Sequence, residues 1–148
     1  MTQPEISGAF TGANNITFGE TWSRDITLTQ GGPPLNLAAY DSRMRAQMRI
    51  ASAAGSTATL IASTEVADYA LAAVAQITVI LPTGGADGVI RISQTVGECR
   101  RMSAVVGNVG KTFYIEFEGV TSGGAVAKLG QGQMEFLPET TVTEPDPI

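Results

Sequence analysis

The sequence predicts a mainly-β fold, a two-sheet antiparallel β-sandwich of the immunoglobulin-like kind with one or two short helices. Several short segments alternate apolar and polar side chains with a period of two, which is typical of strands buried on one face. Turn signals rich in glycine and proline separate these segments at short intervals, as they do in sandwiches. The length of 148 residues suits a single compact domain.

We expect three parts along the chain. Residues 1–18 hold glycines and asparagines among scattered apolar side chains, which predicts a flexible, irregular N-terminal arm that becomes ordered against a partner. Residues 19–138 form the sandwich domain, and the acidic, proline-bearing residues 139–148 form an exposed tail. The sequence shows neither a signal-peptide pattern nor an apolar run near the ~20 residues that span a bilayer, so no membrane partner is expected.

The first strand is predicted where Trp22, Ile26 and Leu28 share one parity and polar residues share the other. Arg24 falls on the apolar parity, so we expect its head either to reach outward near the sandwich edge or to pair with a carboxylate. The glycines and prolines at 30–34 then end the strand and turn the chain.

The clearest alternation lies at residues 41–50, where one face is apolar and the other carries a row of arginines. A planar guanidinium binds a carboxylate on a neighbouring strand as well as one on another chain. The row formed by Arg43, Arg45 and Arg49 is therefore our candidate subunit interface, with an intrachain ladder of ion pairs as the alternative. The side chains expected to face inward are Met44, Ala46, Met48 and Ile50.

The middle of the chain carries weaker signals. A strand is expected at 57–63. The stretch 65–75 is ambiguous, because its alanines favour a helix while the run 76–81 that follows favours a strand. The glycine-rich residues 82–88 predict a turn, and residues 89–93 predict a further strand.

A short helix is predicted after Thr95. Thr95 and Glu98 match a capping box, in which the Thr95 hydroxyl accepts from an amide of the first turn and the Glu98 carboxylate reaches back to the Thr95 N–H. Arg100 and Arg101 would then lie near the end of about two helical turns, where cations suit the helix dipole.

The last strands are predicted from a second strong alternation and a glycine hairpin. Glycines at 123–124 separate an alternating strand at 113–118 from one at 125–129, and glycines at 130 and 132 bend the chain into a final strand at 133–137. On the first of these strands the residues expected inward are Phe113, Ile115 and Phe117, and those expected outward are Tyr114, Glu116 and Glu118.

The composition argues against catalysis. The chain has no histidine, which excludes Ser-His-Asp triads, Cys-His dyads and histidine-bearing zinc sites. Its single cysteine, Cys99, is expected as a small core side chain. We therefore expect a protein that is not an enzyme and holds no cofactor or metal. The net charge of −5 makes nucleic acid an unexpected partner.

Two local patterns resemble catalytic sites without meeting their requirements. Residues 110–112 (Gly-Lys-Thr) resemble the end of a phosphate loop, but Val105 stands where that loop needs a glycine, and a strand follows instead of a helix. Glu116 and Glu118 share one strand face roughly 7 Å apart, which invites comparison with a glycosidase pair. Outward strand positions usually face water, and a cross-strand arginine of the row would keep both carboxylates ionised.

The order of these elements resembles a known family. The motifs are Gly19–Trp22 (GETW), Pro34–Tyr40 (PLNLAAY), Arg43–Arg49 (RMRAQMR), Gly110–Phe117 (GKTFYIEF) and Gly132–Phe136 (GQMEF), followed by Pro138-Glu139-Thr140. Together they are similar to the small β-sandwich domain of tailed-bacteriophage tail and baseplate proteins, such as the N-terminal domain of the baseplate upper protein. The resemblance extends over residues 19–141.

The resemblance implies a non-enzymatic bacteriophage virion structural protein, a tail, baseplate or fibre-attachment adaptor that docks neighbouring subunits. Its partners would be other virion proteins and further copies of itself, and it would be made in the host cytoplasm and reside in the virion. Two alternatives stay open. One is a capsid decoration protein on the head, and the other is a carbohydrate-binding β-sandwich, which would need a platform of exposed aromatic side chains.

Overall fold

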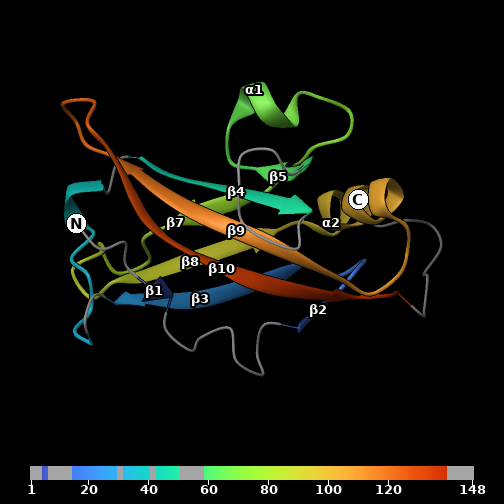
Figure 1. The fold of residues 1–148 in the computed structure, drawn as a ribbon, viewed down its shortest axis with the longest axis horizontal. Helices are drawn as coiled ribbons and strands as arrows, with labels where there is room; N and C mark the ends of the chain where they lie inside the picture. Colours follow the sequence, from blue (N-terminus) through green and yellow to red (C-terminus); the bar gives the residue numbers. More distant parts are fainter. Residues whose placement is uncertain (1–4, 7–14, 30–31, 41–42, 51–58, 140–148) are drawn as a thin grey trace.

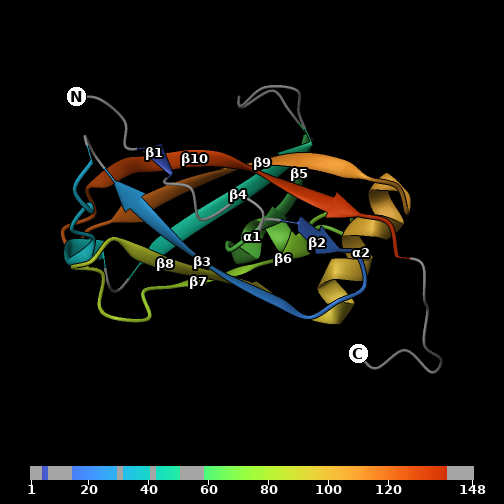
Figure 2. The ribbon, with the colours of Figure 1, turned by 90° about the horizontal axis from the view of Figure 1, so that it is seen from below.

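The computed structural model describes residues 5–6, 15–29, 32–40, 43–50 and 59–139. Within them the chain forms two β-sheets that lie face to face, with one helix packed at the end of the sandwich (Figures 1 and 2). The mainly-β, two-sheet prediction is confirmed.

The smaller sheet has four strands in the order β1-β3-β8-β7, and every neighbouring pair is antiparallel. Trp22 begins the longest of them, on the parity that the sequence predicts to be buried. The strands are β1 (Glu5–Ile6), β3 (Trp22–Thr29), β8 (Val89–Gln94) and β7 (Thr78–Ile80).

The larger sheet has six strands in the order β2-β10-β9-β4-β5-β6. Its central pairs are antiparallel, but β2 runs parallel to β10 and β5 runs parallel to β6. The prediction that all strands of the sandwich pair antiparallel is therefore wrong. Both parallel partners are short edge strands that reach the sheet after a long connection, as parallel pairing requires. The strands are β2 (Asn15–Thr17), β10 (Val126–Leu137), β9 (Lys111–Val120), β4 (Met44–Ile50), β5 (Thr59–Ser63) and β6 (Ala75–Gln76).

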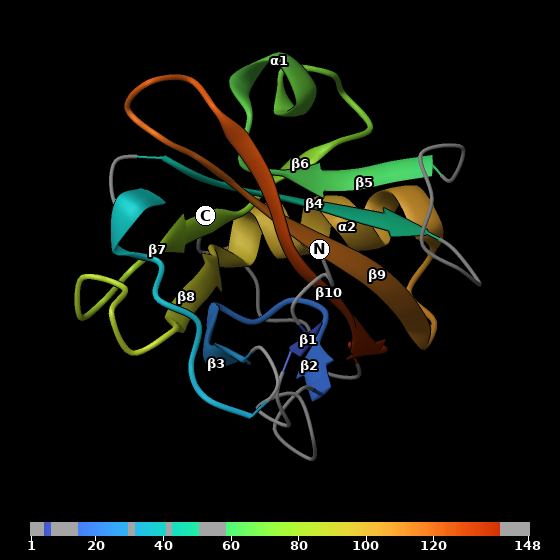
Figure 3. The same cartoon turned by 60° about the vertical axis from the view of Figure 1, so that its left-hand side comes forward.

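In the part of the chain that the structure describes, two α-helices and one 3-10 turn join the strands. The helix α1 (Val66–Tyr69) is a single turn that stands outside the sheets beyond β5 and β6 (Figure 3). The helix α2 (Val96–Val106) is longer and contributes the buried Cys99 and Met102 to the core. A 3-10 helix covers Ala38–Tyr40.

The core lies between the sheets and is aromatic at the α2 end. The rings of Phe18, Phe113 and Trp22 surround Phe136, with ring centroids 5.2, 5.3 and 5.9 Å from that of Phe136. The inward parity predicted for β4 and β9 is confirmed, except that Ile50 is only half-buried. Packing of alternate side chains from both sheets therefore holds the fold together.

The described part of the N-terminal segment belongs to the sandwich. Glu5–Ile6 pairs with β3 and Asn15–Thr17 pairs with β10, while Ile16 and Phe18 are fully buried in the core. The prediction of an irregular arm is wrong for these residues, because two large apolar side chains find a place between the sheets. Residues 1–4 and 7–14 lie outside the described residues.

The ambiguous stretch 65–75 holds a short helix and then a loop, and the strand expected at 76–81 divides between the sheets. Gln76 ends β6 in the larger sheet, whereas Thr78 begins β7 in the smaller one. Ile77 lies at the corner, where its side chain is buried and its N–H donates to the Ser63 carbonyl at 3.0 Å. A run of β-branched residues predicts extended backbone but not a change of sheet within it.

The helix cap is confirmed in one half only. The Thr95 hydroxyl accepts from the Glu98 N–H at 3.3 Å, as predicted. The Glu98 carboxylate instead accepts from the Gln76 N–H at 2.7 Å and from Arg101 at 3.1 Å. The helix also runs for 11 residues rather than two turns, so Arg100 and Arg101 lie within it rather than at its end.

Candidate functional site

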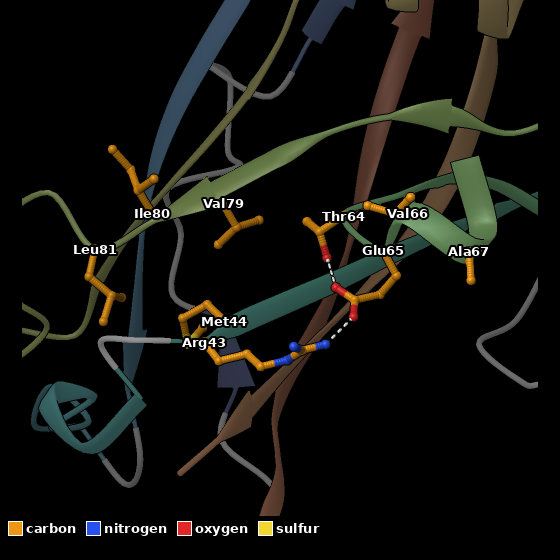
Figure 4. A pocket seen from close by; sticks show the side chains of 9 residues that line it. All are labelled: Arg43, Met44, Thr64, Glu65, Val66, Ala67, Val79, Ile80 and Leu81. Carbon is orange, nitrogen blue, oxygen red and sulfur yellow. Dashed lines mark hydrogen bonds and ion pairs between the residues drawn. The ribbon is translucent and has the colours of Figure 1, made fainter. Parts of the chain in front are cut away.

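A groove of about 700 Å³ lies between the two sheets. It lies where the beginning of β4 faces β7, with α1 at one side (Figure 4). The groove is lined by Arg43, Met44, Thr64, Glu65, Val66, Ala67, Val79, Ile80 and Leu81.

One wall of the groove is the beginning of β4, where Met44 has no backbone partner among the described residues on the β5 side. The Val120 N–H donates to the Arg43 carbonyl, and the Thr64 N–H on the opposite side donates to the Ala46 carbonyl. Because successive strand residues alternate in direction, Met44 directs its backbone N–H and C=O to the same side as Ala46. The ladder with β5 begins only at Gln47, so among the described residues the Met44 backbone has no hydrogen-bond partner on that side.

The other wall is the outer edge of β7, which is the last strand of the smaller sheet among the described residues. The Leu28 N–H donates to the Gly88 carbonyl. With this register, the even-numbered residues of β8 direct their backbone N–H and C=O groups toward β3. The odd-numbered residues of β8 therefore bond β7, through Thr78 and Ile80. Val79 directs its N–H and C=O away from β8, and no described residue bonds them.

Apolar side chains surround these two edges. Val66 on α1 is 65% exposed and Ile80 on β7 is 47% exposed, while Val79 and Leu81 are half-buried against the core. Figure 4 shows Val79 directed toward Met44 across the groove. The groove therefore combines apolar contact area with free backbone donors and acceptors.

The charged residues of the groove are paired within the chain. The Arg43 guanidinium bonds the Glu65 carboxylate, and the Thr64 hydroxyl donates to the same carboxylate at 3.0 Å (Figure 4). Glu65 also lies 4.0 Å from Arg45. These contacts fix Glu65 at the start of α1.

The arginine row continues as an intrachain network on the outer face of the larger sheet. Arg45 on β4 and Lys128 on β10 both bond the Glu118 carboxylate on β9. Arg49 donates to the Gln47 side chain at 3.0 Å. The intrachain ladder of ion pairs, the alternative that the sequence offers, is present for Arg43 and Arg45, and the row as a subunit interface stays a prediction.

Opposing effects set the charge state of Glu118. Partial burial acts to raise the pKa of Glu118, but the hydrogen bond from Lys128 and the charge of Arg45 outweigh it. The pKa of Glu118 therefore lies below its usual range. Glu116, two residues away on the same face, stands opposite Gln47 rather than an arginine. A carboxylate held ionised in this way does not suit the proton-donor role of a glycosidase.

Asp68 accepts hydrogen bonds from two other elements, which the sequence does not predict. Its carboxylate accepts from the Ser63 hydroxyl at 2.7 Å and from the Gln47 amide at 2.9 Å, and so ties α1 to β5 and β4. The Ser63 side chain is fully buried. The only sequence signal was a polar residue on the end of an expected strand, which does not predict a partner.

The remaining candidates have structural positions. Cys99 is fully buried, as predicted, and burial raises the pKa of its thiol. Gly110 precedes β9, and Lys111 and Thr112 are its first two residues, so a strand rather than a helix continues from this motif. Arg24 carries its guanidinium 3.6 Å from Glu20, so one of its two expected outcomes, pairing with a carboxylate, is found.

The part of the chain that the structure describes contains no cluster of side chains suited to hold a metal ion. Among the same residues, no helix has the length and apolar character needed to cross a membrane. No protein-family model matches the chain, and no curated protein matches it.

Proposed function

We propose that the chain is a non-enzymatic structural subunit of a bacteriophage virion, an adaptor in the tail, baseplate or fibre attachment that docks neighbouring subunits. The proposal starts from the resemblance of residues 19–141 to small tail-protein sandwiches. The two-sheet architecture is consistent with it. An immunoglobulin-like relationship of the sandwich is part of the same proposal.

The observation that carries the proposal is the groove between β4 and β7. Its walls are two strand edges whose Met44 and Val79 backbone groups have no described partner, beside the exposed side chains of Val66 and Ile80. Free strand edges are surfaces to which other chains add, through main-chain hydrogen bonds. Such a surface suits assembly with other subunits.

The carbohydrate-binding alternative has less support. Among the described residues, the one tryptophan and the four phenylalanines are buried, and the three tyrosines are half-buried. A sugar-binding platform needs exposed aromatic faces, and none is formed by these residues. The arrangement therefore favours docking over glycan binding.

Particle composition tests the proposal. We expect quantitative mass spectrometry of particles purified from cells that carry this gene to find the chain in a low copy number that matches the symmetry of a tail ring. A copy number close to that of the capsid subunits would place the protein on the head instead. Absence of the chain from purified particles would contradict both virion roles.

A further inference from the structure

We propose that the groove between β4 and β7 binds the segment 140–144 of a second copy of this chain as an added β-strand. The inference rests on the proposed docking role and names the partner. It predicts a head-to-tail contact, in which the tail of one copy enters the groove of the next.

The groove is suited to an extended backbone. Met44 on one wall and Val79 on the other each direct one N–H and one C=O into it, and no described residue bonds them. A compact ligand would leave these four groups to water, whereas a strand presents donors and acceptors on both of its edges. Hydrogen-bond complementarity therefore selects an extended peptide.

The groove has room for a short strand and no more. β7 is three residues long, and its edge ends where the Leu81 carbonyl turns away to accept from the Gly84 N–H. A strand of four residues spans about 13 Å. The occupant should therefore be a brief strand-forming run that is stopped soon afterwards.

The chain itself carries such a run beyond the described residues. Residues 140–143 read Thr-Thr-Val-Thr, four β-branched residues in a row, and Pro145 follows after one intervening residue. A comparable run, Ile77–Ile80, forms the corner and β7. β-Branched residues favour extended backbone, and proline ends pairing because it lacks an N–H.

The side chains of this run match the groove. In a strand, Thr140 and Val142 would face one way and Thr141 and Thr143 the other. Val142 would then contact the apolar lining that Val79 and Leu81 provide, and Thr141 and Thr143 would face solvent. Such a contact joins two different surfaces, so it builds a ring or a filament rather than a two-fold dimer.

Paired variants of the full chain test the inference by sedimentation velocity. Val142→Pro removes a backbone N–H from the segment that binds and so prevents it from pairing as a strand. Val66→Lys places a charge in the groove, at a side chain that is 65% exposed. We expect each variant to self-associate at least about tenfold more weakly than the wild-type chain. The matched control is Val126→Lys, which adds the same charge at a side chain 55% exposed outside the groove, and it should associate like the wild-type chain.

Mixing the two disabled variants gives the sharper result. The Val142→Pro chain keeps its groove and the Val66→Lys chain keeps its tail, so a mixture can form one contact per pair. We expect heterodimers and nothing larger. Wild-type chain that stays monomeric throughout, variants that associate like the wild-type chain, or a mixture that stays monomeric would each overturn the inference.

A peptide of residues 139–148 provides a measurement that does not depend on the Val66→Lys chain folding. The labelled peptide should bind the Val142→Pro chain in fluorescence anisotropy, and a peptide with Val142→Pro should bind at least about tenfold more weakly. Equal binding of the two peptides, or no binding of either, would overturn the inference. Copies that associate in this way but are absent from purified particles would overturn only the proposed virion role.

Discussion

Glu118 shows at the residue level how the outer face of the larger sheet is stabilised. Its carboxylate accepts from Arg45 and Lys128, and Arg45 also has a buried Nε without a hydrogen-bond partner. Glu118→Gln removes the charge that compensates Arg45, so we expect a loss of about 1 kcal/mol in the free energy of unfolding, measured by urea denaturation. Glu116→Gln, two residues away and opposite Gln47, should change it little; equal losses would contradict the pairing.

The same residue predicts a pH dependence. The folded pKa of Glu118 lies below its usual value near 4.5, so ionised Glu118 stabilises the fold above that pH. The contribution is lost as the pH falls below 4.5 and through the folded pKa. The difference in unfolding free energy between the wild-type chain and Glu118→Gln should therefore shrink between pH 5 and pH 3. A difference that stays constant over this range would show that charge is not its cause.

Cys99 gives a prediction about reactivity. Its side chain is fully buried, and burial raises the pKa of its thiol, so little reactive thiolate exists near neutral pH. We expect a colorimetric thiol reagent to modify the native protein orders of magnitude more slowly than the urea-unfolded protein. Rapid labelling of the native protein would contradict the burial of Cys99.

At the level of elements, the sequence predicted those parts whose causes are local. Alternation placed β4 and β9 correctly, and Thr95 marked the start of α2, because parity and capping depend on neighbours a few residues apart. The sheet change at Ile77 involves a hydrogen bond to Ser63, and the burial of Phe18 involves a ring contact with Phe136. Such contacts join distant segments, and no local pattern encodes them.

The groove between β4 and β7 cannot be predicted from the sequence for the same reason. The sequence indicated the arginine row, since arginines at alternate positions are visible along one strand. Among the described residues, Met44 and Val79 lie on open strand edges because β5 begins its pairing with β4 at Gln47 and because β7 is the last strand of the smaller sheet. An unpaired edge is a property of topology, so only the folded chain reveals it.

The helix α2 offers a test of its cap. The Thr95 hydroxyl accepts from the Glu98 N–H, one of the amides that the first turn leaves without a partner. Thr95→Ala should lower the free energy of unfolding by about 1 kcal/mol, measured by thermal or urea denaturation. Thr95→Ser keeps the oxygen and should stay close to the wild-type chain, so equal losses in both variants would argue against a capping role.

For the molecule as a whole, the arrangement of the core predicts one cooperative unfolding transition. Phe136 on β10 contacts Phe18 beside β2 and Trp22 on β3, so one aromatic cluster joins both sheets. The Trp22 indole also donates to Gln94, which in turn donates to the sulfur of Met102 on α2. Because the elements share these contacts, neither sheet keeps a complete core when the other unfolds.

Trp22 is the only tryptophan, so its fluorescence reports this junction while far-ultraviolet circular dichroism reports all the strands. We expect the two signals to give the same midpoint in urea. Phe136→Leu removes part of the shared cluster and should lower the unfolding free energy by about 1–3 kcal/mol, moving both midpoints together. A fluorescence midpoint that shifts while the dichroism midpoint stays in place would mean that the sheets unfold separately, and that the aromatic cluster does not join them.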